Sequence, residues 1–204
     1  PFFPALGDVW TDGANWRLGH WLTGRLGAVS LAALVRHLCL RAGLPESRID
    51  VSGLWGASEG YAITALESPR ASITTLAQHF GFDEVESEGT IRFLMRGRAP
   101  VATIAHADLV AGSMDGEAFE LTRAQETELP QALKWQVARA DEDYEAALVE
   151  ASRITVDTSR IASESFPMAV PPEEAERRCR RALQEAWAGR ESVVFRLPPS
   201  RLAL

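Results

Sequence analysis

The sequence predicts an α+β protein, with a small α/β domain first and then a strand-rich, barrel-like domain that contains one inserted amphipathic helix. Two observations carry this prediction. Up to about Gly112, helical periodicity alternates with short strand-like runs, whereas the later apolar residues mostly alternate as they do in strands. A well-marked helix at residues 172–189 interrupts the later strands. We therefore expect two domains, residues 1–112 and 113–204, the second incomplete in this segment.

The clearest local signal is a helix followed by a hairpin in residues 68–94. Ser68 is a good N-cap residue, and Pro69 suits the first helical turn, where a missing N–H costs nothing. Gly81 can take the left-handed conformation that closes a helix, and Gly89 can take the positive φ of a tight turn. Helical spacing before Gly81 and alternation after it predict one shared core. The residues of this predicted core are Ile73, Leu76, Phe80, Val85, Ile91 and Phe93.

Two helices and two short strands are expected before this unit. Apolar residues recur at helical spacing in residues 12–26 and again in residues 30–43, where Ser30 is the predicted cap. Short strands are expected at 49–51 and 61–65, on either side of a glycine-rich flexible linker.

Strands dominate the second part. They are expected at 101–104, 119–122, 129–138 and 193–197. Residues 158–172 are interpreted as a connector to the late helix, whose arginines and glutamates are interpreted as a solvated face. Periodicity leaves helix and strand open for residues 141–153.

Composition excludes several classes of protein. The content of hydrophobic residues is 46% and that of charged residues is 24%, which is ordinary for a soluble globular chain. No apolar run approaches the roughly 18 residues of a membrane span, and the N-terminal stretch lacks the pattern of a signal peptide. The net charge of −7 argues against a protein that grips nucleic acid, because such binding neutralises phosphates. Cys39 and Cys179 each fit a helical pattern as small buried residues.

One string matches a catalytic pattern, because Gly56-Ala57-Ser58-Glu59-Gly60 fits the G-x-S-x-G nucleophile elbow. The alternative function is therefore a serine hydrolase centred on Ser58, with His79 or His106 as the base. The elbow needs an apolar strand before it and a helix after it, and neither is predicted here. His79 is expected on the polar side of its helix. The sequence context thus favours the linker over the nucleophile.

The sequence also contains no recognisable motif for binding a cofactor or a metal ion. The histidines are scattered singly, and the acidic clusters at 83–88 and 141–143 lack the spaced oxygens and central glycine of a calcium loop. We therefore predict no catalytic, cofactor-binding or metal-binding residues and no enzyme. A third hypothesis is a carbohydrate-binding module, which would stack sugars on exposed tryptophans, but packing in the core explains these residues more simply. The tryptophans concerned are Trp10, Trp16, Trp21 and Trp55.

Several long strings, in order from residue 15 to residue 199, resemble a known family. They are ANWRLGHWLTGRLG, LVRHLCLRAGL, GYAI with SPRASITTLAQHFGFDEVESEGTIRF, LTRAQETELPQALKWQVARADEDYEAA, and FRLPPS. They are similar to the large tail-tip, or host-specificity, hub protein of bacterial gene transfer agents and related siphophage-like particles. A more distant similarity is to the lambda-type tail tip attachment protein and to the hub proteins of phage baseplates.

The resemblance implies a structural role without chemistry. Three copies would surround the tail axis as a homotrimer, at the distal end of the tail tube, and would link the tube to host-recognition parts for DNA delivery. Expected neighbours are the distal tail protein, other baseplate proteins and the cell-wall peptidase of the tail tip, with DNA present only in transit. The implied location is the tail tip of a virion or gene transfer agent particle that is assembled in the bacterial cytoplasm. The resemblance also favours a strand after Tyr144.

Overall fold

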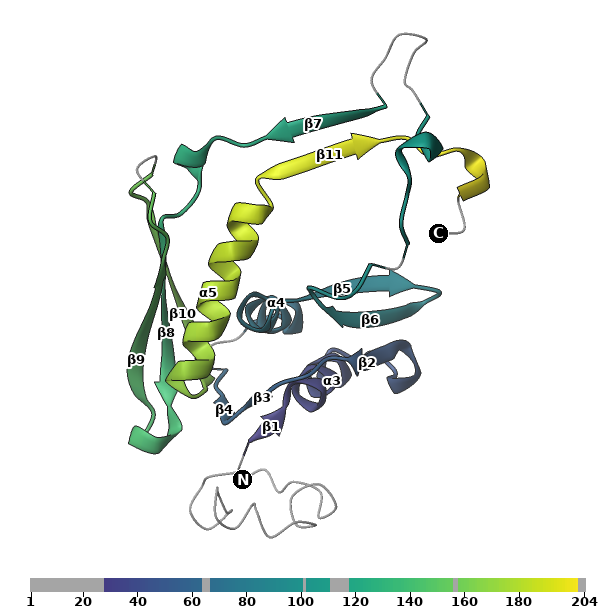
Figure 1. Cartoon of the computed structure of the whole chain (residues 1–204). Coiled ribbons are helices and arrows are strands. Elements are labelled where there is room, and N and C mark those ends of the chain that lie inside the picture. Colours follow the sequence, from purple (N-terminus) through teal and green to yellow (C-terminus); the bar gives the residue numbers. More distant parts are fainter. Residues whose placement is uncertain (1–27, 64–66, 101, 111–117, 156–157, 202–204) are drawn as a thin grey trace.

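A computed structural model shows an α+β fold and describes residues 28–63, 67–100, 102–110, 118–155 and 158–201. In these residues three α-helices pack on open sheets, and none of these sheets closes into a barrel (Figure 1). The α+β class is therefore confirmed, whereas the described ranges contain no barrel-like closure. The predicted helix at 12–26 and the residues Trp10, Trp16 and Trp21 lie outside the described residues.

Helices α3 (Leu31–Arg41) and α4 (Pro69–Phe80) begin where the sequence predicts. The Ser30 side chain accepts a hydrogen bond from the N–H of Ala33 at 3.2 Å, and Ser68 caps α4 in the same way at 3.3 Å. These bonds satisfy N–H groups that have no partner inside the helix. Both helix starts are therefore encoded locally.

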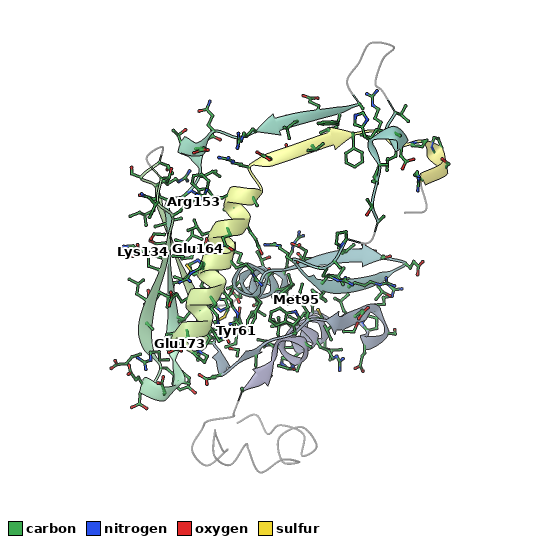
Figure 2. The ribbon with its side chains drawn as sticks, in the orientation of Figure 1. Tyr61, Met95, Lys134, Arg153, Glu164 and Glu173 are labelled. Carbon is green, nitrogen blue, oxygen red and sulfur yellow. The ribbon has the colours of Figure 1, made fainter. Side chains whose placement is uncertain are left out.

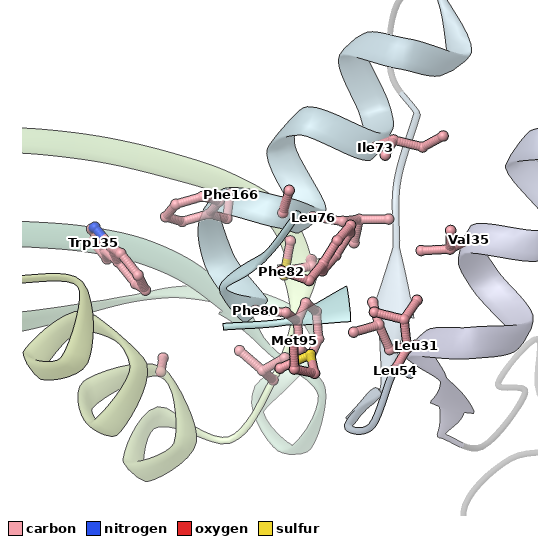
Figure 3. Close-up of a cluster of buried hydrophobic side chains, with 14 of the residues drawn as sticks. Leu31, Val35, Leu54, Ile73, Leu76, Phe80, Phe82, Met95, Trp135 and Phe166 are labelled. Atoms are coloured by element: carbon pink, nitrogen blue, oxygen red, sulfur yellow. The ribbon is translucent and has the colours of Figure 1, made fainter. Parts of the chain in front are cut away.

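The first sheet has three strands in the order β2–β6–β5. They are β2 (Ile49–Gly53), β5 (Phe82–Ser87) and β6 (Thr90–Met95). β2 runs parallel to β6, while β5 and β6 form the predicted antiparallel hairpin. α3 packs against β2, and α4 packs against α3 and β5, so the two helices and the hairpin enclose a cluster of apolar side chains (Figure 3).

The residues predicted for this core do not all lie in it. Buried in it are Ile73, Leu76, Phe80 and Phe93, and Ile91 packs against it from a half-buried position. The expectation for Val85 is wrong, because its side chain is 47% exposed. Strand register gives the reason: Val85 is paired with Arg92 on the outer face, whereas Phe82 is paired with Met95 on the inner face. Phe82 therefore fills the place that the sequence analysis assigned to Val85.

The second sheet has four strands in the order β4–β10–β8–β9. They are β4 (Gly60–Tyr61), β8 (Ala132–Arg139), β9 (Glu145–Ser152) and β10 (Ile161–Ala169). Helix α5 (Pro172–Ala188) packs on β8 and β9 (Figure 1). The alternation predicted for β8 is confirmed at Trp135 and Val137, which are buried, and at Gln136, which is exposed. The open choice between helix and strand for residues 141–153 resolves as the strand β9 after Tyr144, as the family resemblance favours.

Three other expectations are wrong. Residues 158–172 do not form a mere connector, because β10 is a central strand that pairs parallel to β8 and antiparallel to β4. Pro167 hid this strand from the sequence pattern; it lies where the register with β8 shifts, so its missing N–H breaks no ladder bond. The strand expected at 61–65 stops at Tyr61, and Ile104 lies in an irregular segment.

The remaining elements are short. Strand β3 (Ala57–Ser58) pairs with β1 (Val29–Ser30), so the expected flexible linker is instead partly strand. Strands β7 (Phe119–Arg123) and β11 (Glu191–Phe195) form a separate two-stranded sheet. Single turns of 3-10 helix are η1 (Glu46–Arg48), η2 (His106–Asp108), η3 (Glu126–Glu128), η4 (Ala140–Glu142) and η5 (Pro199–Arg201).

One continuous core joins the two main sheets. α4 packs against α5, and β4, which precedes α4, pairs with β10. Buried residues on both sides of Gly112 belong to the same apolar cluster. The division at residues 1–112 and 113–204 therefore stays a prediction, and the core gives no support for cutting the chain there.

The C-terminal end of α4 provides a test of this packing. Gly81 has φ 72°, and a Cβ atom at this position would clash with the guanidinium group of Arg181. Gly89 has nearly the same φ, 73°, but a Cβ there would meet no atom within 4 Å. We expect Gly89→Ala to lower the free energy of unfolding by about 1–2 kcal/mol through backbone strain alone.

Gly81→Ala should cost about 1–3 kcal/mol more than Gly89→Ala, because Arg181 would have to leave a buried carbonyl oxygen. Urea unfolding of the two variants measures the difference. Equal losses would contradict the inferred role of the contact between Gly81 and Arg181.

Candidate functional site

Ser58, the candidate nucleophile, is buried, with 1% of its surface exposed. Its hydroxyl donates a hydrogen bond to the carbonyl oxygen of Gly60 at 2.7 Å and lies 3.1 Å from that of Ala169. It belongs to β3, and the short strand β4 follows where a nucleophile elbow requires a helix. The hydroxyl therefore ties strands together, and neither His79 nor His106 is among its hydrogen-bond partners.

The two histidines considered as bases lie apart, each beside its own aromatic neighbours. His79 is fully buried and contacts the rings of Trp135 and Phe166, at centroid distances of 5.3 and 4.9 Å. Its placement on the polar side of α4 is therefore a wrong prediction. His106 belongs to η2, with its ring centroid 6.3 Å from that of Phe119. No hydrogen bond between any two of these three candidate hydrolase residues is found in the described part of the chain.

His79 is held as a neutral imidazole. Its Nε2 atom lies 3.2 Å from Nη1 of Arg178, which can only donate, so Nε2 accepts and Nδ1 carries the proton. Nδ1 is buried and has no hydrogen-bond partner. Burial, and after it the positive charges of Arg178 and Arg181, lower the pKa of His79 to about 3. The ring therefore serves packing and accepts one bond, and it is a poor general base for a serine that lies elsewhere.

Two arginines of α5 hold the end of α4. Arg178 stacks over the ring of Phe80, with its guanidinium carbon 4.2 Å from the ring centroid. Arg181 donates a hydrogen bond to the carbonyl oxygen of Phe80, one of the last carbonyls of α4. Such carbonyls have no partner within the helix, and they carry the negative end of its dipole. The charged face of α5 is therefore only partly solvated, since the side chain of Arg178 is 11% exposed.

The described residues offer no metal site or reactive thiol. Within them, no group of three His, Cys, Asp or Glu side chains could hold a metal ion. Cys39 and Cys179 are both buried and free of disulfides. Burial raises the pKa of Cys39, and it raises that of Cys179 to about 11, so neither thiol is ionised at neutral pH. No helix in the described ranges is both long and apolar enough to cross a membrane.

A group of exposed apolar side chains lies on the β7–β11 ribbon, which consists of Phe119–Arg123 and Glu191–Phe195. Pairing places Phe119 beside Phe195 and Leu121 beside Val193 on one face. All four side chains are more than 40% exposed. The sheet contains only these two strands, so both outer edges are free of further strands within the described residues. A ribbon of this kind is marginal alone, and a gathered apolar surface marks a site of interaction.

The ribbon is firmly attached to the body. Trp187, near the end of α5, donates a hydrogen bond from Nε1 to the carbonyl oxygen of Pro130 at 2.9 Å. Arg153 lies beside the C-terminal part of α5 (Figure 2), and its guanidinium carbon is 4.4 Å from the ring centroid of Trp187. Arg190, just before β11, forms an ion pair with Glu126 and is largely buried. These contacts join the base of the exposed apolar ribbon to the body of the chain.

Comparison with known proteins identifies the family. Residues 68–204 match the family described as "Putative phage tail protein". The chain belongs to this phage tail protein family. The tail protein also aligns with a chain in the structure described as "Virion of native gene transfer agent (GTA) particle", with 36% identity and a TM-score of 0.78. That alignment covers 99% of this tail protein and 46% of the virion chain, and the resemblance predicted from the sequence strings is confirmed.

A second solved structure shares the fold. The crystal structure of the tail protein from Neisseria meningitidis MC58 aligns at 12% identity with a TM-score of 0.52, covering 83% of this tail protein and 51% of that chain. At this identity the likeness concerns the fold alone. The tail protein described here thus spans about half the length of each of these two solved chains. No curated protein matches it.

Sequence reasoning identified both ribbon strands of this tail protein but not their exposure. The two predicted strands at 119–122 and 193–197 prove to pair with each other, as β7 and β11. Leu121 alternates with Glu120 and Thr122 as a residue of a core strand does. Alternation predicts which face of a strand is apolar, but it does not show what covers that face. Trp55 was also misjudged as a core residue, because its side chain is 65% exposed.

His79 provides the prediction for this site. In the unfolded chain its pKa is about 6.5, whereas in the folded chain it is about 3. Between these values the unfolded chain binds a proton that the folded chain does not, so the free energy of unfolding falls as the pH falls. From pH 7 to pH 4 we expect a loss on the order of 3 kcal/mol from this residue.

His79→Gln keeps a neutral acceptor for Arg178 but does not titrate in this range. Urea unfolding at several pH values should show a smaller acid loss in this variant than in the wild type, with the carboxylates contributing equally to both. Parallel pH profiles would contradict the assignment of a buried neutral imidazole.

Proposed function

We propose that this tail protein is a structural part of the hub at the tip of a gene transfer agent or related phage-like tail. Three copies would form a ring around the tail axis and link the distal end of the tube to the proteins that recognise the host. The observation that carries the proposal is the 36% identity, over 99% of this chain, with a chain of a native gene transfer agent particle. Assembly, not chemistry, is the proposed activity.

The β7–β11 ribbon supports assembly as the activity. Leu121 and Val193 are 56% and 49% exposed, and apolar surface of this kind is normally covered in a finished particle. Both ribbon edges also offer backbone groups to a neighbouring strand, which is a common mode of recognition between chains. The neighbours we propose are other copies, the distal tail protein, further baseplate proteins and the cell-wall peptidase.

Charge and side-chain chemistry support the remainder of the proposal. With a net charge of −7, the chain would repel DNA, so that DNA could pass through the ring without binding. Ser58 is buried and bonded to the backbone, which disfavours hydrolase chemistry at this position. The location that follows is the tail tip of a particle assembled in the bacterial cytoplasm.

Leu121→Asp in a particle-producing bacterium tests the proposal. The exposed position predicts that the free energy of unfolding of the purified chain changes by about 0.5 kcal/mol or less. A buried aspartate in the assembled particle would be costly, so we expect the amount of the variant in purified particles to fall by at least roughly tenfold, the effect of about 1.4 kcal/mol.

Leu148→Asp is the matched control, since Leu148 is 66% exposed but lies on β9, away from the ribbon. Quantitative mass spectrometry of purified particles should find this variant near the wild-type amount. Normal incorporation of Leu121→Asp, or absence of the wild-type chain from the tail fraction, would contradict the proposal.

A further inference from the structure

We propose that the hollow beside Trp55 receives the acidic turn, residues 140–145, of a second copy of this chain. The inference rests on the proposed function, because it names a contact by which neighbouring copies would join in a ring. It concerns a surface separate from the β7–β11 ribbon. Four features carry it: the lining of the hollow, its charge, the exposed chemistry of the turn, and the positions of both on the molecule.

The Trp55 hollow has a volume of about 310 Å³. Its lining consists of Trp55, Phe80, Met95, Glu174, Arg177, Arg178 and Arg181. Trp55 is 65% exposed, which is a large apolar surface to leave in water on a short loop. Tryptophan and arginine are the residue types that most often carry the binding energy of protein interfaces. The lining is therefore that of an interface centre and not of an ordinary surface depression.

The hollow is cationic, although the chain as a whole is acidic. Three arginines and one glutamate line it, so its walls carry a surplus of two positive charges. Arg178 and Arg181 point inward to α4, whereas the side chain of Arg177 is 70% exposed. Its present partner is Glu174, one turn earlier on the same helix, and an exposed pair of this kind is weak. Arg177 is therefore available for an incoming carboxylate, and an acidic segment with an aromatic side chain fits the hollow.

The acidic turn has this chemistry. It joins β8 to β9 and carries four exposed acidic residues around Tyr144, namely Asp141, Glu142, Asp143 and Glu145. Arg139 forms ion pairs with two of them, Asp141 and Glu142. Tyr144 is 46% exposed and has φ 64°, next to a second positive φ at Asp143. Two consecutive residues with positive φ, neither of them glycine, are uncommon, and here they present an aromatic ring among carboxylates.

The hollow and the turn lie on different sides of α5, near its first turns. Glu174 and Arg177 line the hollow on the side of the helix that packs against α4, whereas the acidic turn is at the end of the second sheet, close to Glu173 (Figure 2). The ring of Tyr144 lies next to Gly60 of its own copy. A contact between two different patches is heterologous, and repeated contacts of this type close into a ring when the rotation permits. The match in charge and chemistry therefore points to a second copy as the occupant.

Charge reversal in the purified full chain tests the contact. We expect the wild type to self-associate weakly in sedimentation experiments, with an affinity that falls as salt is added. Arg177→Glu should raise the dissociation constant at least roughly tenfold, because it places a carboxylate opposite the acidic turn. Arg180→Glu is the matched control: Arg180 lies on the same helix, is 64% exposed and pairs with Glu176. It should stay within about twofold of the wild type.

Cysteine pairing provides the second test. Mixing Arg177→Cys with Glu145→Cys should yield a disulfide-linked dimer, whereas Arg180→Cys mixed with Glu145→Cys should not. The natural residues Cys39 and Cys179 are buried and do not compete.

A wild-type chain that stays monomeric would overturn this contact, as would equal effects of the Arg177 and Arg180 substitutions. Neither outcome bears on the incorporation of the Leu121→Asp variant into particles, which tests the proposed function. Failure of this contact can therefore be distinguished from failure of the proposed function.

Discussion

The structure depends on the way in which α5 holds the end of α4. A helix leaves its last carbonyl groups without partners, and here Arg181 donates to the carbonyl of Phe80 while Arg178 stacks on the Phe80 ring. Gly81 permits this contact in two ways. It adopts the left-handed conformation that ends α4, and it has no side chain in the space that the guanidinium of Arg181 occupies. His79 accepts a further bond from Arg178 within the same buried cluster. Segments about one hundred residues apart in the chain are thereby fixed relative to each other.

The position of the β7–β11 ribbon, the proposed assembly surface, follows from this contact. α5 packs on the second sheet, and the chain leaves its end through Arg190 directly into β11. The ion pair of Arg190 with Glu126 and the ring of Trp187 fix the start of the ribbon. These contacts join the start of the ribbon to the body of the chain. A subunit of a ring needs surfaces that keep fixed directions, since small angular errors accumulate around the ring.

Local chemistry made much of the fold predictable from the sequence. Serine caps, the closing Gly81 and the alternation of β8 each act through residues adjacent in sequence. The predictions that failed concern features that depend on contacts with residues far away in the sequence. Pro167 disguised β10 because its irregular register is defined only by β8 and β4, and His79 looked polar because the aromatic rings around it come from other elements. For the same reason the sequence identified the ribbon strands but could not show that no other part of the described chain covers them.

The most direct test is a reconstruction of the intact particle at a resolution that places side chains. The account predicts three copies around the axis at the distal end of the tail, with Leu121 and Val193 buried against a neighbouring subunit. A chain found elsewhere in the particle, or a ribbon that faces open solvent in the assembled tail, would contradict it.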